Sequence, residues 1–589
     1  MKKTSEEALL TKLYFRLLSY QVLLLIINAL TGIVDSLFAS NFIGKVAMSA
    51  IGYYSPLNHF LFAVSITLVS GSQLLVGEAM GKNDMDSVNK FFSTDVIAAV
   101  VIGITTSIIL ALCALTNFTQ LFIPDQPERS AMNLYLIGQA FGIPALVLGQ
   151  QFFAFLSLEN QTKRTMVASF ICIITNTVMD GILVVGMKLG TLGLGLGTAL
   201  GMWGFLITMG LFYLSGKSEM KFLGKVFSFS DSIHIIKRGY PGALSRFVEM
   251  FRCFIINALI LTYVGSVGLS AFAAVNSVMA VFWPLPYGML AVTRMLFGIT
   301  IGEQDRRSLQ NINRIVLVKC TIFQVLVAML IVALGTPLTQ MFYRDMSDPV
   351  YNMTLMGFRI LPLCMGFSVW CLHFGCYGQT MQKKGLSHVL PIMDGAVFVI
   401  ACSILLIPIM KMNGLYVANV LNGVLCCSFI VIYAAACLRR LPRNLDELLV
   451  IPDEFGVSDD ERIDISITQI EEVTAISEQV VDFCRKKNID EKRAFYAGLA
   501  LEEMAGNVVE HGFTKDTEKH SIDIRVVHKN NDIILRIKDN CRAFNPLERT
   551  TILQTDEITK NVGIRLVNKI AKEMNYQSLL GLNVLTIKI

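Results

Sequence analysis

Two stretches of sequence, VGEAMGKNDMDSVN at residues 76–89 and FGITIGEQDRRSLQ at residues 297–310, share one pattern of glycine, aspartate and serine. The identical positions pair Gly77 with Gly298, Gly81 with Gly302, Asp84 with Asp305, and Ser87 with Ser308. A second pair, IGKVAMSA at 43–50 and VGSVGLSA at 264–271, recurs at the same offset along the chain. Two matches at one offset, without a gap between them, indicate that the chain contains an internal repeat.

The sequence around this repeat is too apolar for a water-soluble domain. Residues 1–440 contain 30 Lys and Arg and 19 Asp and Glu, whereas residues 441–589 contain 20 and 26. Only the second part reaches the proportion of charged residues, about a quarter, that soluble domains carry. The chain therefore joins a membrane part to a soluble part, and its apolar content excludes a disordered or collagen-like protein.

Twelve apolar runs in the membrane part are long enough to cross a bilayer as helices, which takes about 20 mostly apolar residues. They lie near residues 14–33, 55–80, 92–116, 132–157, 166–187 and 193–215 in the first half, and near 243–264, 270–299, 313–335, 353–377, 388–410 and 413–437 in the second. With six runs each, both halves have the same orientation. The predicted fold is a polytopic α-helical membrane protein of two parallel six-helix lobes, residues 1–220 and 221–440, with a substrate cavity between them.

The basic residues predict how this protein is oriented. The N-terminus, alternate loops and the exit from the last run hold 21 Lys and Arg, whereas the opposite loops hold five. Positive charge collects on the cytoplasmic side, so we expect a multi-pass protein of the cell membrane with both termini and the tail in the cytoplasm. The overall excess of basic residues lies between spans and predicts no nucleic-acid partner. The 13 cysteines have no metal-ligand spacing along the chain and are interpreted as small core residues.

The membrane part resembles the multidrug and toxic compound extrusion (MATE) family. The resemblance rests on the aspartate of GIVDSLF (Asp35), on the repeated glycine–glycine–aspartate loops, and on NTVMD at residues 176–180. It implies a transporter that exports organic, often cationic, amphiphilic compounds through the lipid bilayer in exchange for H⁺ or Na⁺.

Four polar residues of the first lobe are candidates for cation coupling. Asn176 and Asp180 lie four residues apart, on one face of the fifth helix, and the resemblance implies that Asp35, Asn176, Asp180 and Thr198 line a cation site. A carboxylate at the bilayer centre costs about 2.5–3.5 kcal/mol on insertion scales, so one that persists there usually faces a cavity or a partner. Burial favours the protonated form, which lets such a group take up and release a proton. In the alternative interpretation, these aspartates only hydrogen-bond neighbouring helices.

In the second lobe, Glu249 resembles a cation-site residue of another MATE branch. Its neighbours Arg246 and Arg252, one turn away on either side, offer an alternative interpretation as an internally neutralised cluster.

The tail divides into an acidic linker, residues 441–465, and a small α+β domain, residues 466–589. Periodicity predicts helices over 468–487, 490–511 and 563–574, strands over 520–529 and 532–539, and a final strand that ends in IKI.

Two motifs of the tail point to a nucleotide. In LALEEMAGNVVEHGF (499–513), Glu503 and Asn507 recur on one helix face; an acid there can orient water, and an amide can hold Mg²⁺. In IKDNCRAFNP (537–546), Asp539 ends a strand and can accept a hydrogen bond from an adenine amino group. With NVGIRLV at 561–567, these motifs resemble the anti-sigma-factor serine kinases of the GHKL ATPase superfamily. The resemblance implies ATP with Mg²⁺, with Glu503 as the catalytic residue, Asn507 as the metal ligand, and Asn507, Asp539 and Gly563 as nucleotide-binding residues.

Two departures from that family leave the tail's role open. Cys541 and Asn561 stand where the family has glycines that give the backbone room beside the nucleotide. The tail is then a protein kinase, a nucleotide-binding module or a docking module for a cytoplasmic regulator protein. No GxxxxGK[ST] loop is present, so ATP is not expected to drive transport.

The sequence predicts a cation-coupled multidrug antiporter with a cytoplasmic, ATP-binding-like regulatory domain. One alternative is a membrane sensor whose transporter-like part controls the anti-sigma-factor-like tail. Another is an exporter of a lipid-linked precursor, which the carboxylate pattern of the first lobe disfavours.

Overall fold

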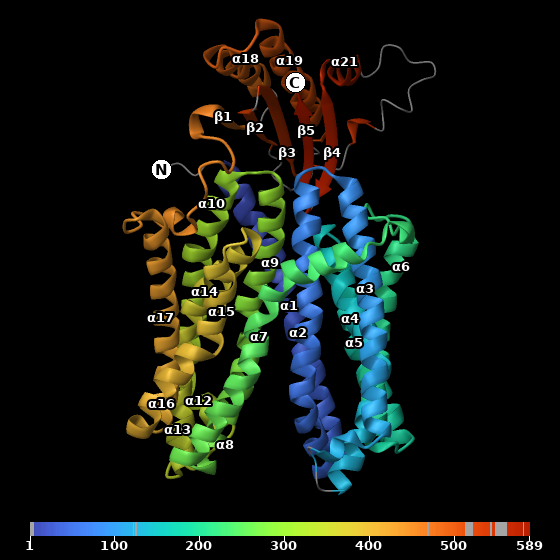
Figure 1. Ribbon diagram of the computed structural model, residues 1–589, viewed down its shortest axis with the longest axis vertical. Coiled ribbons are helices and arrows are strands. Elements are labelled where there is room, and N and C mark those ends of the chain that lie inside the picture. Colours follow the sequence, from blue (N-terminus) through green and yellow to red (C-terminus); the bar gives the residue numbers. More distant parts are fainter. Residues whose placement is uncertain are drawn as a thin grey trace.

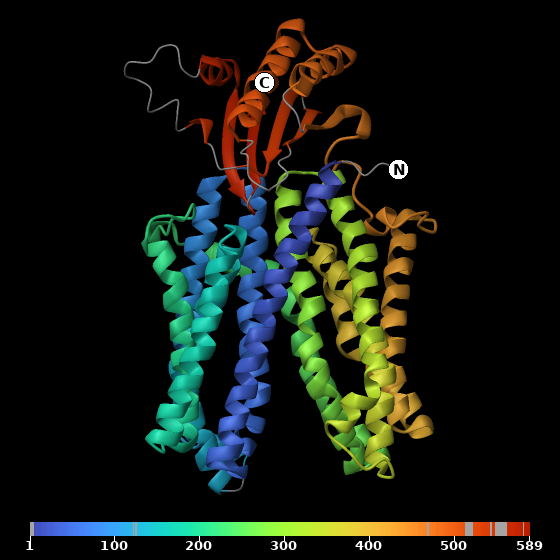
Figure 2. The same ribbon diagram turned by 180° about the vertical axis from the view of Figure 1, so that it is seen from behind.

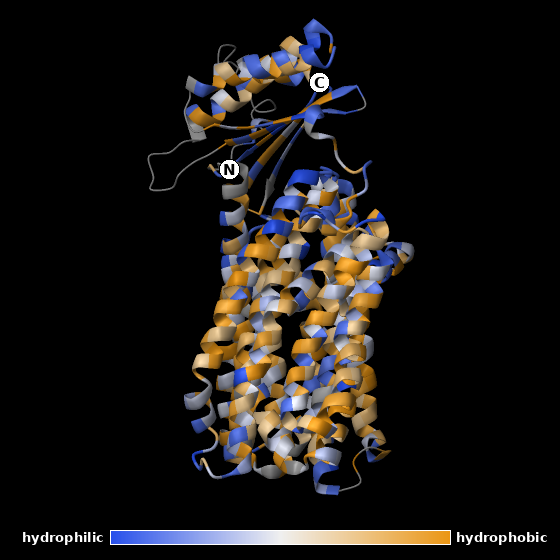
Figure 3. Ribbon diagram, turned by 90° about the vertical axis from the view of Figure 1, so that its left-hand side faces the viewer, coloured by the Kyte–Doolittle hydropathy of each residue, from blue (hydrophilic) through white to orange (hydrophobic). Residues whose placement is uncertain are grey.

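A helical bundle carries a small α+β domain at one end (Figure 1). The structure is a computed structural model that describes residues 5–121, 123, 126–467, 471–512, 522–529, 531–541, 545–547, 562–580 and 582–589. Hydrophobic residues predominate in the bundle, whereas the α+β domain mixes hydrophobic and hydrophilic residues (Figure 3). The predicted helical membrane protein with an α+β tail is confirmed.

Each half of the bundle contains six long helical segments. The first half consists of α1 (Ser5–Phe38), α2 (Lys45–Gly81), α3 (Met85–Leu115), α4 (Gln126–Leu158), α5 (Thr162–Asp180) with a π-helical turn at Gly181–Gly186, and α6 (Gly190–Leu214). The second half consists of α7 (Phe229–Tyr263), α8 (Ser266–Phe282), α9 (Pro284–Gly302), α10 (Arg306–Arg314), α11 (Thr321–Ala333), α12 (Gly335–Gln340), α13 (Pro349–Ile360), α14 (Met365–Thr380), α15 (Leu390–Ile392), α16 (Phe398–Met410) and α17 (Met412–Leu438). Several of these are consecutive parts of one span, such as α8 with α9 over Val267–Gly302.

Ten helices among the described residues are long and apolar enough to cross a membrane. The sequence predicts twelve spans, and the other two correspond to α1 and α7, of 34 and 35 residues, which stand in the same bundle (Figure 2). The charged residues Arg246, Glu249 and Arg252 of α7 lower its hydropathy, although a helix of this length reaches across a bilayer.

The repeat recurs as local backbone geometry. Gly44 and Gly265, at equivalent positions of the repeat, both have positive φ angles, of 108° and 87°, and each precedes a helix. Asp84 and Asp305 both cap helices, with side chains that accept hydrogen bonds from the backbone N–H of Ser87 (3.0 Å) and Ser308 (3.1 Å). The shared letters therefore mark positions that need a left-handed glycine or an N-terminal cap.

The lobes meet at the end that carries the tail and their ribbons diverge toward the other end (Figure 1). Glycines of the repeat form part of this contact: a Cβ on Gly81 would lie 2.9 Å from Cα of Gly302, and one on Gly77 would lie 3.4 Å from Cα of Gly298. α2 approaches α7 equally closely, because a Cβ on Gly71 would lie 2.0 Å from the Ile235 carbonyl oxygen. Small residues thus bring the backbones of the two lobes together.

The tail is an antiparallel five-stranded sheet of order β1-β2-β3-β5-β4, with helices on one face. Its elements are β1 (Arg462–Ile467), α18 (Glu471–Lys486), α19 (Glu491–Gly512), β2 (Ile522–Lys529), β3 (Asp532–Asp539), α21 (Val562–Ile570), β4 (Glu573–Leu579) and β5 (Leu582–Lys588). Ile524 of β2, Leu535 of β3 and Leu501 of α19 belong to one buried core between the sheet and the helices. The neighbouring strand residues, Arg525 and Arg536, face away from the helices.

Three details of the tail differ from the sequence prediction. β1 begins at Arg462, inside the stretch predicted as linker. The predicted helix 563–574 ends at Ile570, and β4 follows from Glu573. The linker itself lies along the bundle, with Leu449 buried and Asn313 donating a hydrogen bond to the Leu445 carbonyl oxygen at 2.9 Å.

Candidate functional sites

The four coupling candidates of the first lobe lie together. Asn176 donates from Nδ2 to Asp35 Oδ1 at 3.0 Å and approaches Asp180 Oδ2 at 3.4 Å. Thr198 donates from Oγ1 to Asp35 Oδ2 at 2.9 Å. Three helices therefore contribute: α1 the first carboxyl group, α5 the second together with the amide, and α6 the hydroxyl. The resulting cluster offers only oxygen and nitrogen atoms.

The cluster is enclosed by the lobe. Asn176 and Asp180 have no exposed surface, and Asp35 and Thr198 are each 7% exposed. Close packing of α6 makes this possible, because a Cβ on Gly197 would lie 2.0 Å from Asp180 Oδ1. No cation pairs with these carboxyl groups among the described residues. Two carboxyl groups that share one amide without a counter-charge form a site suited to a proton or a small hard cation.

Glu249 is not part of this cluster. It forms ion pairs with Arg252 at 2.7 Å and with Arg246 at 3.2 Å, both on α7. The Arg246 guanidinium also stacks 4.2 Å from the centre of the Tyr287 ring. The geometry is that of the neutralised cluster that the sequence offers as an alternative.

The nucleotide-site candidates of the tail lie on α19 and on the elements packed against it. Asn507 donates from Nδ2 to the Glu503 carbonyl oxygen at 2.7 Å, one turn away. A Cβ on Gly563, at the start of α21, would lie 1.7 Å from Glu503 Oε2. Asn561 lies outside the described residues. The structure thus brings Gly563 against the proposed catalytic carboxylate, where the absence of a side chain leaves room for it.

Asp539 ends β3 on the face of the sheet that the helices cover. Its Oδ1 accepts from Asn583 Nδ2 at 2.7 Å and from the Cys541 backbone N–H at 2.9 Å, and it is 5% exposed. Cys541 does not have a positive φ angle. The turn after Asp539 therefore tolerates a cysteine where the family has glycine.

The opposite face of the sheet docks on the second lobe. The loop between α9 and α10 presents Glu303 and Asp305, with side chains only 2% and 0% exposed. Lys538 and Arg536 of β3 pair with Glu303 at 2.8 and 3.3 Å. Arg525 of β2 pairs with Asp305. This site, which we call the junction, consists of Glu303, Asp305 and their basic partners.

The junction neutralises two like charges that lie next to each other in the sheet. Arg525 and Arg536 are direct cross-strand neighbours of β2 and β3, where like charges destabilise the pair. Burial opposes the ionisation of Asp305, but the charges of Arg525, Lys538 and Arg462 outweigh it and hold the pKa of Asp305 well below its usual range. For Glu303, Lys538 and Arg536 likewise outweigh burial and lower its pKa. The acidic loop and the basic strands therefore complement one another.

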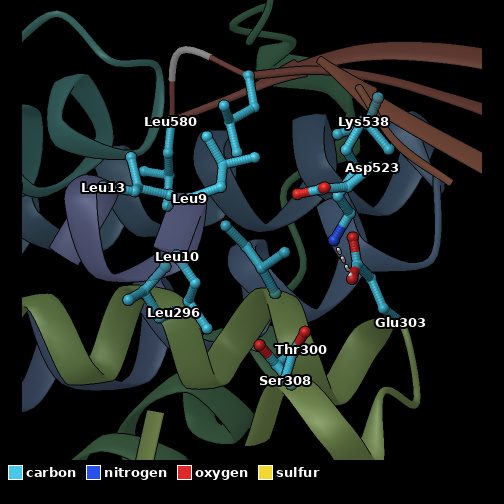
Figure 4. A pocket seen from close by; sticks show the side chains of 13 residues that line it. Leu9, Leu10, Leu13, Leu296, Thr300, Glu303, Ser308, Asp523, Lys538 and Leu580 are labelled. Carbon is cyan, nitrogen blue, oxygen red and sulfur yellow. Dashed lines mark hydrogen bonds and ion pairs between the residues drawn. The ribbon is translucent and has the colours of Figure 1, made fainter. Parts of the chain in front are cut away.

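The first lobe also contacts the tail at this end. Arg16 of α1 donates to the Leu580 carbonyl oxygen, in the β4–β5 turn, at 2.8 Å. A small cavity lies beside this contact, with Leu9, Leu13 and Leu296 along its apolar wall and the Glu303–Lys538 pair at its other end (Figure 4). The tail thus spans both lobes at the point where they meet.

Two features were missed by sequence reasoning. Glu303 and Asp305 of the junction belong to the repeat, but their role depends on strands of the tail, far along the chain. The available signal was in those strands, where the basic residues Arg525, Arg536 and Lys538 alternate with apolar ones. The other is Asp95 of α3, which is fully buried beside Ser72 of α2. Its sequence signal is a lone acid within an apolar run.

Comparison with known proteins places both parts of the chain. Residues 22–182 match the MatE family, and residues 468–589 match the histidine kinase-like ATPase domain. The probable multidrug resistance protein NorM of Acinetobacter baylyi is 23% identical over 306 residues, which cover 50% of this chain and 66% of NorM. The probable multidrug resistance protein YoeA of Bacillus subtilis is 20% identical, over 53% of this chain and 71% of YoeA. The chain thus spans about two thirds of these curated relatives.

Solved structures share the fold of the membrane part. An outward-facing multidrug resistance MATE family transporter of the MOP superfamily superposes with a TM-score of 0.68 at 18% identity, covering 77% of this chain and all of that one. A MOP superfamily transporter from Pyrococcus furiosus, described as having a binding pocket of reversed polarity, gives a TM-score of 0.66 at 17% identity over 74% of this chain and 99% of its own.

Residues 22–182 therefore match the MatE family, and the membrane part shares the fold of solved MATE structures. The tail is a histidine kinase-like ATPase domain. The chain thus joins, through a packed linker, a part that matches the MatE family to a part that matches the histidine kinase-like ATPase domain.

Proposed function

We propose that this protein exports organic, often cationic, amphiphilic compounds across the cell membrane in exchange for H⁺ or Na⁺. The observation that carries the proposal is the pairing of Asp35 with Asp180 through Asn176 inside the first lobe. The curated relatives named as multidrug resistance proteins support it. The excess of basic residues in the loops on the tail's side supports a cytoplasmic tail.

The cluster couples transport to a cation because ionising both of its carboxyl groups costs electrostatic free energy. Two buried carboxylates that share one amide repel each other unless a proton or Na⁺ neutralises them. The π-helical turn at Gly181–Gly186 follows Asp180 directly, and such turns often occur at functional sites. Release of the cation changes the relative stability of the two lobe arrangements, so a gradient of that cation drives the exchange.

Replacing Asp180 with asparagine tests the coupling. In liposomes with a pH or sodium gradient and no ATP, we expect wild-type protein to export a fluorescent organic cation and Asp180→Asn to lose gradient-driven export. Asp95→Asn makes the same change at another buried carboxyl group of the same lobe and should retain export. Undiminished export by Asp180→Asn would disprove the coupling site.

We infer that the tail is a nucleotide-responsive regulator of the transporter. Nucleotide binding is supported by the closeness of Glu503, Asn507 and Gly563 on α19 and α21 and by the matched ATPase family. Regulation is supported by β3, because two successive residues of this strand face the proposed nucleotide site and the junction. Asp539 faces the proposed nucleotide, and Lys538 faces the junction.

Nucleotide binding can be measured on the full chain. We expect the purified protein to bind a fluorescent ATP analogue with Mg²⁺, and Asp539→Asn to weaken binding by about tenfold, as loss of a charge-assisted hydrogen bond does. Asp532→Asn, at the other end of β3, should bind normally. If wild-type protein binds no nucleotide, the tail is a docking module instead.

A sensor is the second candidate, because the junction lets the tail respond to the arrangement of the lobes. In that case the membrane part binds an amphiphile, and the tail captures or phosphorylates a cytoplasmic regulator protein. Ligand-dependent exposure of the tail in a protein that transports nothing under either gradient would favour the sensor.

A further inference from the structure

We propose that the second lobe contains a thiolate-rich metal site, formed by Cys371, Asp394 and Cys426, that binds Zn²⁺. The two sulfur atoms and a carboxylate oxygen of Asp394 lie within 4.8 Å of one another. Within the described residues, these three are the one set of His, Cys, Asp or Glu side chains that lie close enough together to hold a metal ion. It is independent of the proposed transport function.

The three side chains converge from separate spans. Cys371 lies on α14, Cys426 on α17, and Asp394 in the π-helical stretch Met393–Val397 that interrupts the span between them. Wide turns of this kind frequently occur at functional sites. The spacings of the three residues along the sequence match no ligand motif, which is why the cysteines looked like core residues.

The separations are suited to a tetrahedral ion. With bonds of about 2.3 Å to sulfur and about 2.1 Å to oxygen, the ligand atoms around Zn²⁺ lie about 3.5–3.8 Å apart. Adjustments of about 1 Å bring three atoms within 4.8 Å to those positions.

The surroundings orient and balance this ligand set. Asn422 donates from Nδ2 to Asp394 Oδ1 at 2.8 Å, which fixes the orientation of the carboxylate. The charge of Arg252 on α7 acts on Asp394 and offsets the negative ligands. Cys371 and Cys426 are buried, and Asp394 is half-buried.

The ligand types select a soft or borderline ion. Thiolates prefer Zn²⁺ over Na⁺ or Mg²⁺, whereas the oxygen-only cluster of the first lobe suits the hard ions. The two lobes therefore hold polar clusters of different chemistry. A bound ion would tie three consecutive spans of the second lobe together.

Cobalt is the probe, because thiolate-bound Co²⁺ absorbs in the near ultraviolet. We expect the full-length protein, purified in detergent under reducing conditions, to develop this band with one equivalent of Co²⁺ and to lose it when Zn²⁺ is added. Cys371→Ala and Cys426→Ala should abolish the band. Cys320→Ala, which removes another fully buried thiol of the same lobe, should keep it.

A second variant and a second measurement guard against misfolding. Asp394→Asn can keep its hydrogen bond to Asn422 and should lower Co²⁺ affinity about tenfold or more. Zn²⁺ should raise the melting temperature of wild-type and Cys320→Ala protein but not of Cys426→Ala. A folded wild-type protein without the band, or a band that survives both ligand substitutions, would overturn the proposal in favour of thiols that only hydrogen-bond to Asp394.

Discussion

At the scale of single residues, Gly197 decides whether Asp180 can occupy its site. A Cβ at position 197 would lie 2.0 Å from Asp180 Oδ1 and 3.2 Å from the Asp180 backbone nitrogen, so alanine must displace the carboxyl group. We expect Gly197→Ala to lower stability by about 1–3 kcal/mol through overpacking and to abolish gradient-driven export. Gly181→Ala, where nothing lies within 4 Å of the added Cβ, should retain both. Thermal melting and the liposome assay measure the two effects.

Gly563 has the same role in the tail. The atom that an added Cβ would meet is the flexible end of Glu503, so Gly563→Ala should shift that carboxylate without unfolding the domain. We expect weaker Mg²⁺–ATP binding and an unchanged melting temperature. Gly506→Ala has open space on the same helix as Glu503 and should bind normally, with a small gain in helix stability. Equal binding by both variants would mean that Glu503 takes no part in the site.

The sequence alone predicts a polar cluster only where its residues lie on one helix or in one motif. Asn176 and Asp180 share a helix face, so their proximity follows from spacing, and Asp35 joins them through the family resemblance. Cys371 and Asp394 give no such signal, because only the packing of separate spans brings them together. For Glu249 the sequence supports two interpretations, a cation site and a neutralised cluster. In the structure Glu249 forms ion pairs with its arginine neighbours.

At the scale of elements, alternation predicts the strands β2 and β3 but not what covers their charged face. β4 is a polar strand, EMNYQSL, with few of the apolar residues that mark a strand, whereas β1, RIDISI, alternates isoleucine with polar residues but begins inside the stretch predicted as linker. Their partners β2 and β5 supply the hydrogen bonds, and β1 pairs with a strand that follows only after two intervening helices. Local patterns could not predict pairing over that separation.

The junction should resist changes of pH near neutrality. The pKa values of Glu303 and Asp305 are both lowered, because the charges of Lys538, Arg536, Arg525 and Arg462 together outweigh their burial. Carboxyl groups with lowered pKa values contribute stability above their ordinary values, about 4, and lose it as the pH falls through the lowered ones. Energy transfer between fluorophores at Lys486 and Lys384 should therefore stay constant from about pH 5 to 8 and fall only under strongly acidic conditions. A loss of transfer between pH 8 and 6 would contradict this account.

At the scale of the whole molecule, the repeat predicts two similar lobes, and the tail distinguishes between them. The loop at Lys82 and Asp84 of the first lobe has the same backbone as the loop at Glu303 and Asp305, including left-handed residues at Asn83 and Gln304. Lys82 is exposed and pairs with Glu78 on its own helix. The basic strands of the tail would repel Lys82 but pair with Glu303, and this charge difference favours docking on the second lobe. Symmetry alone could not predict that choice.

The docked tail should hold the lobes together at its end of the bundle. It contacts the second lobe through Glu303 and the first through Arg16, across the glycine contact of α2 with α9. A transporter that alternates must separate the lobes there to open toward the tail's side. We therefore expect Glu303→Lys, which copies the charge of Lys82, to release the tail and increase the population of separated lobes.

Pulsed electron resonance between spin labels at Lys163 and Lys384, exposed residues of the two lobes, measures that population. Glu303→Lys should move the distribution to longer distances, and adding Lys538→Glu should restore it by reversing the pair. Lys82→Glu, the mirror change in the first lobe, should leave it unaltered because the tail does not touch that loop through an ion pair in the described part of the chain. A distribution identical in all four proteins would mean that the tail rests on the transporter without constraining it. The export assay with Asp180→Asn tests the coupling site separately. A failure of the distance prediction would therefore not count against that site.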